Sequence, residues 1–234
     1  MKRTDAASTM WHGSIPRMDR GRPLGGATLL AVGVAIATVI GLAVAVALHP
    51  EPLPGEVSSI RRWQRLAEPI PTLAEWVRVS TSTQATLVVI AVPAWWAITR
   101  HRGAGALAVA ILLVTMLVAQ PVIKEVIDRP RPTEAQVDVR APYTSKSFPS
   151  GHSMSTTVAW GTAAIVAARR GRPVLAGVLC APIALTAVAS QVQGVHWPSD
   201  ALAGTLIGGV AAVVAAAVLL REETKAPKHP ASDV

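Results

Sequence analysis

Three long stretches without a charged side chain constrain this chain more than any other feature. Residues 27–48 give 22 such positions in a row, and residues 104–123 and 201–220 give 20 each. About 20 apolar residues in a helix cross the hydrocarbon core of a bilayer. The alternating pattern of a membrane β-barrel is absent. The sequence therefore predicts an all-α, polytopic membrane protein.

Six apolar segments are expected to cross the membrane, and they predict how the chain is divided. The segments are residues 27–48, 81–99, 104–123, 151–168, 174–190 and 201–220. They separate a polar N-terminal tail (1–26), expected to be disordered and cytoplasmic, from a six-span domain (27–220) and a cytoplasmic C-terminal tail (221–234). Residues 57–68 and 72–79 are predicted to form short helices at the membrane interface, with Trp63 and Trp76 at headgroup level.

The basic residues predict the orientation of the spans. The chain has 22 Lys and Arg residues and a formal net charge of +8. With the N-terminus in the cytoplasm, 13 of the 22 fall on the cytoplasmic side, several of them in short loops, as the positive-inside rule favours. Both termini are then cytoplasmic, and residues 124–150 and 190–200 both lie on the outer side, where they can meet. A nucleic-acid-binding protein is disfavoured, because the bases are not gathered on one compact domain.

Two polar segments on the outer side carry residue types suited to binding a phosphate. In "KEVIDRPRP", Lys124 and Arg131 could converge on one anion, since lysine offers a point charge and arginine a bidentate fork. In "PSGH", Ser150 is a good helix N-cap, Gly151 lets an anion approach the backbone, and His152 lies in the first turn. Each segment alone has an ordinary alternative: bases at headgroup level for the first, and a plain helix cap for the second.

A third segment pairs a histidine with a carboxylate. In "GVHWPSDALAG", His196 and Asp200 are four residues apart, and Pro198 suits the first turn of a helix. The aspartate could accept a hydrogen bond from one ring nitrogen of His196 and leave the other nitrogen free to attack. The ordinary alternative is an aspartate at a helix N-terminus beside a loop histidine. All three segments are expected at the outer membrane edge, so together they are far more specific than any one of them.

In this order and spacing the three segments resemble the type 2 phosphatidic acid phosphatase (PAP2) superfamily over about residues 80–220. The resemblance implies a six-helix membrane bundle that works without a metal. It implies that His196 is the nucleophile and forms a phosphohistidine, that Asp200 orients it, and that His152 is the general acid and then the base. The phosphate oxygens would be held by four groups, namely Lys124, Arg131, Ser150 and the Gly151 backbone N–H.

The chain departs from the family pattern at the third motif. That motif normally places a Ser-Arg pair with the arginine six residues before the nucleophilic histidine, and this chain has Ala189 and Ser190 there. The loss of one donor to a charged transition state can cost about 3 kcal/mol. Three accounts are open: activity at a reduced rate, compensation by Arg129 or Arg140 from the long outer loop, or binding without turnover.

The expected function is metal-independent hydrolysis of a lipid phosphate or diphosphate at the extracytoplasmic face of a bacterial inner membrane. Candidate substrates are an isoprenoid carrier diphosphate, as in cell-wall carrier recycling, phosphatidic acid, or phosphatidylglycerol phosphate. No cofactor or metal site is expected: the single cysteine, Cys180, lies in an apolar segment, and the sequence contains no zinc motif. The expected partners are the lipid phosphate and the bilayer, and the sequence predicts no oligomeric state.

Other functions fit parts of the same pattern. The alternative is a lipid-phosphate-binding or transport protein with weak or no turnover, motivated by Ser190. Phosphotransfer to a second lipid also remains open. A vanadium haloperoxidase is disfavoured, because those relatives are soluble and this chain has membrane spans.

Overall fold

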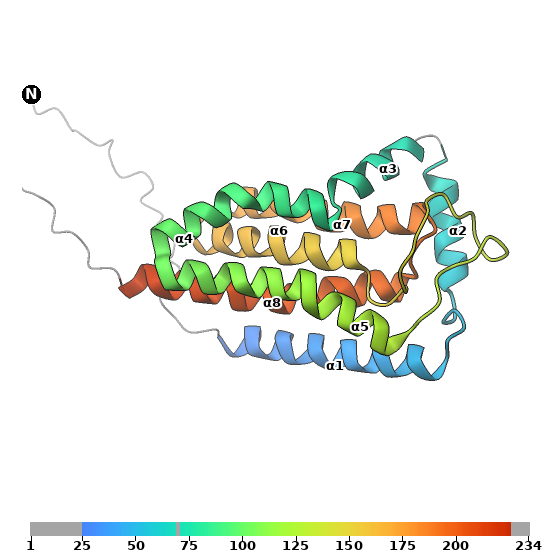
Figure 1. Ribbon diagram of the computed structural model, residues 1–234, viewed down its shortest axis with the longest axis horizontal. Helices are drawn as coiled ribbons and strands as arrows, with labels where there is room; N and C mark the ends of the chain where they lie inside the picture. Colours follow the sequence, from blue (N-terminus) through green and yellow to red (C-terminus); the bar gives the residue numbers. More distant parts are fainter. Residues whose placement is uncertain (1–24, 69–70, 226–234) are drawn as a thin grey trace, which may run out of the picture.

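The computed structural model describes residues 25–68 and 71–225, and this part of the chain is helical without a β-strand. The elements in chain order are α1 (Gly26–Leu48), α2 (Glu56–Leu66), α3 (Pro71–Ser80), α4 (Thr83–Val114), a π-helical turn η1 (Thr115–Ala119), α5 (Gln120–Ile127), α6 (Gly151–Arg169), α7 (Pro173–Val192) and α8 (Pro198–Lys225). The long helices lie side by side, while α2 and α3 lie at one end of them (Figure 1). The all-α class predicted from the sequence is thus confirmed.

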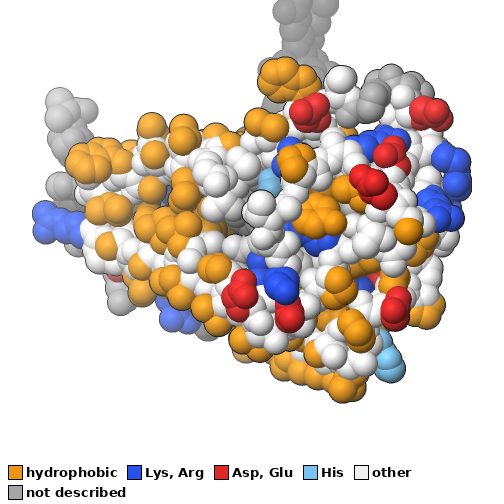
Figure 2. All heavy atoms as spheres, turned by 45° about the vertical axis from the view of Figure 1, so that its right-hand side comes forward, with side chains coloured by type: hydrophobic (Ala, Val, Ile, Leu, Met, Phe, Trp, Pro, Cys, Tyr) orange, Lys and Arg blue, Asp and Glu red, His pale blue; other side chains and the backbone are white. Residues whose placement is uncertain are grey.

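Four helical stretches are long and apolar enough to cross a membrane, namely Gly26–Leu48, Thr83–Ile127, Pro173–Val192 and Pro198–Glu222. Their large apolar side chains face outward: Val92 and Val174 are 76% and 81% exposed. On the face that Figure 2 shows, hydrophobic side chains spread over the helical body, while most charged side chains lie toward the end that carries α2 and some Lys and Arg side chains lie at the opposite end. An apolar belt around a helical body with polar ends is the surface of a multi-pass membrane protein.

The predicted spans 81–99 and 104–123 form two helical segments that run in opposite directions and meet inside α4. Arg102 has φ 43° and ψ −114°, which breaks the helix inside α4. A Cβ on Gly105 would overlap the backbone carbonyl of Ala97, so the two halves pack closely after the reversal. The predicted span 151–168 forms α6, which falls outside the four apolar stretches. The count of six crossings therefore stays a prediction.

Helix α6 is the centre of the bundle and packs against α4, α7 and α8. A cluster of buried side chains from α4, η1, α6 and α8 forms the core, comprising Ala108, Leu112, Met116, Val158 and Ala215. Helix α8 approaches α6 at Gly204, where a Cβ would overlap the carbonyl oxygen of Ser150. This close approach brings the first turns of α6 and α8 together: the Ser150 N–H donates to the Asp200 carbonyl at 3.0 Å.

The end of the bundle that carries α2 also carries the two loops that precede α6 and α8 (Figure 1). The Arg140 N–H donates to the carbonyl of Gln193 at 3.0 Å, so the segments 124–150 and 190–200 meet as predicted. The two short helices expected at 57–68 and 72–79 are α2 and α3, and Trp63 and Trp76 are both exposed. The predicted N-terminal tail lies almost wholly outside the described residues. The domain boundary expected at 220 falls within α8, which continues to Lys225 through residues of good helix propensity.

Candidate active site

A polar pocket of about 320 Å³ lies at the end of the bundle that carries α2 and α3. Its walls come from α3, α4, α5, α6, the loop before α6 and the loop before α8. The residues with chemistry on these walls are Arg78, Lys124, Arg131, Gly151, His152 and His196. Five of the predicted site residues are therefore brought together, along with one arginine that the sequence did not point to.

His196 and Asp200 have the expected relationship. The Nδ1 atom of His196 lies 3.5 Å from Asp200 Oδ2, and both side chains are buried. This separation is within ion-pair range but too long for a well-formed hydrogen bond, and Nδ1 has no other acceptor among the described residues. Such contacts commonly tighten when substrate binds. The Nε2 atom of His196 lies 3.2 Å from Arg131 Nη1, so the ring is held between a carboxylate and a guanidinium.

Burial and the Arg131 charge lower the pKa of His196 to about 3, while Asp200 acts in the opposite direction. Both lowering effects disfavour the imidazolium ion, the first because a charge is poorly solvated inside the protein and the second because like charges repel. His196 is therefore neutral near pH 7, and a neutral imidazole is the form that has a lone pair for attack.

Asp200 is fixed by donors on its other sides. Arg129 Nη1 donates to Oδ1 at 2.6 Å, the Ser147 hydroxyl donates to Oδ2 at 2.5 Å, and the Trp197 N–H donates to Oδ2 at 2.9 Å. The second amino group of Arg129, Nη2, donates to Glu56 of α2 at 2.6 Å. This buried chain of charges fixes the carboxylate that faces His196.

The prediction that Arg129 could supply charge to the phosphate is wrong. Its side chain is fully buried between Glu56 and Asp200 and is not part of the pocket wall. The physical reason is that two carboxylates compete successfully for one guanidinium in a buried site. Arg129 therefore supports Asp200 from the side away from the pocket, and its Nε, unpaired among the described residues, is buried on a residue that does not line the pocket.

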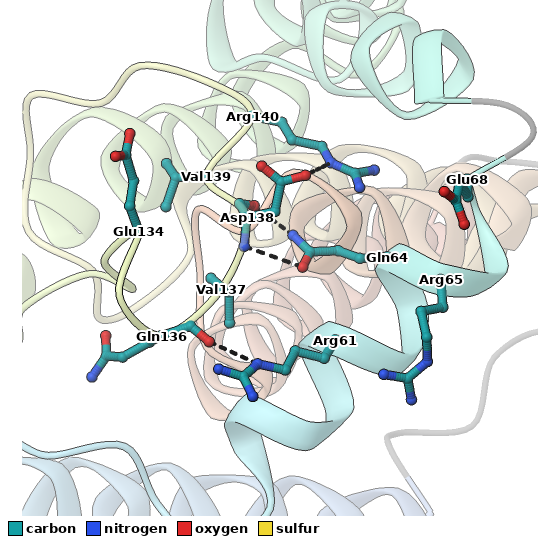
Figure 3. Close-up of a pocket in the computed structure, with 10 residues that line it drawn as sticks. All are labelled: Arg61, Gln64, Arg65, Glu68, Glu134, Gln136, Val137, Asp138, Val139 and Arg140. Carbon is teal, nitrogen blue, oxygen red and sulfur yellow. Dashed lines mark hydrogen bonds and ion pairs between the residues drawn. The ribbon is translucent and has the colours of Figure 1, made fainter.

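Arg140 does not line the pocket either; it lines the separate cavity that Figure 3 shows. Its Nε donates to Asp138 at 2.6 Å, in a separate cavity between α2 and the outer loop, where Gln64 also bonds to Asp138. Asp138, two residues away on the same loop, forms an ion pair with Arg140 and holds its side chain on that loop. Neither Arg129 nor Arg140 thus lines the pocket, and each is paired with a carboxylate elsewhere.

Lys124 and Arg131 line the pocket as predicted. Lys124 is buried in the last turn of α5 and donates to the carbonyls of Lys146 and Ser147. Arg131 donates through Nε to the Ser145 carbonyl at 2.7 Å and through Nη1 to the Val195 carbonyl at 2.6 Å. Neither cation is paired with a carboxylate among the described residues.

The first turn of α6 presents a histidine and a glycine to the pocket. His152 Nε2 is buried without a hydrogen-bond partner in the described part of the chain, and Gly151 lies beside it on the pocket wall. The Ser150 hydroxyl is the N-cap of α6: it accepts a bond from the Ser153 N–H at 3.4 Å and is fully buried. The Ser150 hydroxyl therefore bonds at the helix end and Ser150 does not line the pocket, so its contact with the phosphate stays a prediction.

The third-motif position is also turned away from the pocket. The Ser190 hydroxyl donates to the Ala187 carbonyl at 2.8 Å within α7, and Ser190 does not line the pocket. The arginine that sequence reasoning missed is Arg78 in the last turn of α3, which does line it. The only local signal for Arg78 is its place in a short amphipathic segment, which does not distinguish a pocket residue from a headgroup contact.

The described residues contain no group of three His, Cys, Asp or Glu side chains able to hold a metal ion.

No curated protein matches the sequence. A crystal structure described as the first transmembrane PAP2-type phosphatidylglycerolphosphate phosphatase, from Bacillus subtilis, has a similar fold. The TM-score is 0.62 and the identity 21%, over 79% of this chain and 93% of that one. The model of the PAP2 superfamily matches residues 103–223, which carry the Lys-Arg, Ser-Gly-His and His-Asp segments. The chain therefore belongs to the PAP2 superfamily.

Proposed function

We propose that this protein is a metal-independent phosphatase that hydrolyses a lipid phosphate or diphosphate through a phosphohistidine on His196. The observation that carries the proposal is the convergence of two histidines and unpaired cations on one pocket. Phosphoryl transfer needs an in-line nucleophile and positive charge or donors around the equatorial oxygens, and these residue types supply both.

Each pocket residue has a role in this scheme. The neutral Nε2 of His196 attacks phosphorus while Asp200 stabilises the imidazolium that forms. The bond from phosphorus to the leaving lipid oxygen breaks, and His152 gives that oxygen its proton. His152 then takes a proton from water, which attacks the phosphohistidine and releases inorganic phosphate. Lys124, Arg131 and the Gly151 backbone neutralise and orient the phosphate throughout.

The substrate is proposed to be a membrane lipid at the extracytoplasmic face of a bacterial inner membrane, with both termini in the cytoplasm. The position of the pocket at one end of an apolar bundle supports this, because a lipid headgroup lies at that depth. Phosphatidylglycerol phosphate, phosphatidic acid and an isoprenoid carrier diphosphate remain the candidates. The first is the substrate named for the Bacillus subtilis protein of similar fold.

The test is release of inorganic phosphate from a panel of these lipids by the purified protein in EDTA. Wild type is compared with His196→Gln, His152→Gln and, as a matched control on the lipid-facing surface of α7, Cys180→Ala. We expect release by wild type and the control, loss in both histidine variants, and a trapped phosphoprotein that is absent from His196→Gln. Strict dependence on added Mg²⁺, or full activity in both histidine variants, would overturn the mechanism.

A lipid-phosphate-binding or transport protein is the second candidate. The neutral Ser190, which bonds within α7 and leaves the pocket without a third-motif arginine, favours it. The same assay separates the two: phosphate binding without any release by wild type supports binding or transport.

A further inference from the structure

Arg78 occupies the pocket from a helix outside the region that the PAP2 model matches. It lies in the last turn of α3 and shares the pocket wall with Lys124, Arg131, His152 and His196. Its Nε atom is buried and has no hydrogen-bond partner among the described residues. A buried guanidinium N–H without an acceptor is costly, so an arginine in this state is suited to an acceptor that arrives with the ligand.

Helix α3 covers the part of α7 where the family's third arginine is expected. Ala74 of α3 packs with Ala189 and Val192 of α7, and the neighbouring Val77 and Val188 extend this contact. Position 190 lies within that stretch of α7. Arg78 follows Val77 directly. Helix α3 therefore brings a guanidinium to the pocket beside the turn of α7 that carries Ser190 in place of the family's arginine.

The charges around the pocket are compatible with a third cation that binds the phosphate. Asp200 is paired with Arg129 on the side away from the pocket, and the pocket wall itself carries no acidic side chain. A phosphate group brings about two negative charges and three oxygens that accept hydrogen bonds. Lys124 and Arg131 approach from α5 and the loop before α6, whereas Arg78 approaches from α3.

We propose that Arg78 is the third phosphate-binding cation of this pocket and replaces, from α3, the arginine absent at position 190 of α7. The inference rests on the proposed function only for its effect on catalysis, since binding of a phosphate group by Arg78 does not require hydrolysis. It assigns the chain a substrate contact outside the three motifs of the family.

The test uses inorganic phosphate as the probe and the full-length protein in detergent. The affinity of the protein for inorganic phosphate is measured by calorimetry for wild type, Arg78→Gln and Arg78→Lys. The matched control is Arg62→Gln, which removes an exposed arginine of α2 outside the pocket. We expect Arg78→Gln to weaken phosphate binding about 10- to 100-fold, which is the range for one charge-assisted hydrogen bond. Arg78→Lys should lose less, because it keeps the charge, and Arg62→Gln should stay within about twofold of wild type.

Catalysis gives a second readout that a purely structural role would not change. Arg78→Gln should lower kcat/KM for a lipid phosphate about 100-fold. In Arg78→Ala, added guanidinium ion at millimolar concentration should restore part of the lost rate, because it can occupy the vacated position. If Arg78→Gln does not fold, Arg78→Met carries the test, since its unbranched stem keeps the packing on α7.

The outcomes separate this inference from the proposed function. Phosphate affinity equal to wild type in folded Arg78→Gln, or wild type that binds no phosphate, overturns the role of Arg78. Arg78-dependent phosphate binding by a wild type that releases nothing from any lipid overturns the proposed hydrolysis and leaves the role of Arg78 standing.

Discussion

At the scale of single residues, the environment of His196 fits its proposed role as the nucleophile. Arg131 lies 3.2 Å from Nε2, and Asp200 lies 3.5 Å from Nδ1. Burial and Arg131 together lower the pKa of His196 to about 3, and the nearby carboxylate does not reverse this. The folded protein therefore favours the unprotonated ring. In the proposed mechanism, Asp200 stabilises the positive charge that develops when Nε2 bonds to phosphorus.

The low pKa of His196 predicts how stability depends on pH. Between the unfolded value near 6.5 and the folded value of about 3, the unfolded chain binds more protons than the folded one. Stability should therefore fall as pH falls through this window. Replacing His196 by Gln removes the effect, so the Tm of His196→Gln in detergent should decline less steeply than that of wild type between pH 6.5 and 4.

His49→Gln is the control for this experiment, because His49 is an exposed histidine at the end of α1. Its Tm should follow the wild-type curve at each pH. If the curves of His196→Gln and wild type run parallel from pH 6.5 to 4, the folded protein does not hold His196 unprotonated.

At the scale of elements, a buried charge chain joins α2 to the first turn of α8. Both oxygens of Glu56 accept hydrogen bonds: Oε1 from the Ser199 N–H and hydroxyl, and Oε2 from Arg129 and the Leu53 N–H. In Glu56→Gln, the side-chain NH₂ group would face groups that are themselves hydrogen-bond donors, so these bonds could not form. Because the buried Arg129 would also lose one of its two carboxylates, Glu56→Gln should destabilise the protein by about 3 kcal/mol.

Thermal unfolding in detergent measures this effect, with Glu51→Gln as the control. Glu51 is exposed and lies five residues before Glu56, in the connection between α1 and α2. Glu56→Gln should lower Tm clearly, and Glu51→Gln should leave it unchanged. A Tm shift of the same size in both variants would mean that the charge chain adds nothing to stability.

The packing of α8 on α6 makes a second prediction at this scale. A Cβ on Gly204 would overlap the Ser150 carbonyl and approach Ser153 to 3.2 Å, whereas a Cβ on Gly209 would meet nothing within 4 Å. Gly204→Ala should therefore push apart the helix turns that carry His152 and Asp200 and lower phosphate release at least tenfold. Gly209→Ala should keep activity and raise Tm slightly through better helix propensity. Equal activity of the two variants would contradict this account.

The sequence predicted the elements and motifs whose signals are local. Ser150 and the His196–Asp200 pair are marked by residue type and short spacing at helix ends, so their places follow from the chain itself. Glu56 has no such mark, because its partner Ser199 is 143 residues away. The sequence makes Arg129 a possible source of compensating charge because its own charge is visible there and its buried carboxylate partners are not.

At the scale of the whole molecule, the helices form an apolar body with polar ends. The pocket, α2 and the loop before α6 lie at one end, and the reversal of α4 lies at the other (Figure 1). The reversal carries Arg100 and Arg102, which the positive-inside rule favours on the cytoplasmic side. The pocket is then expected on the extracytoplasmic side.

Cysteine labelling in intact cells tests this orientation. The only cysteine is removed as Cys180→Ala, and one new cysteine is then placed at Glu134 or at Gly103. Both positions are exposed, the first on the loop before α6 and the second beside the reversal of α4. A membrane-impermeant maleimide should label Glu134→Cys in intact cells and Gly103→Cys only after the membrane is opened, with no labelling of the Cys180→Ala background. Labelling of Gly103→Cys alone in intact cells would place the pocket in the cytoplasm, where it could act only on lipid phosphates of the inner leaflet.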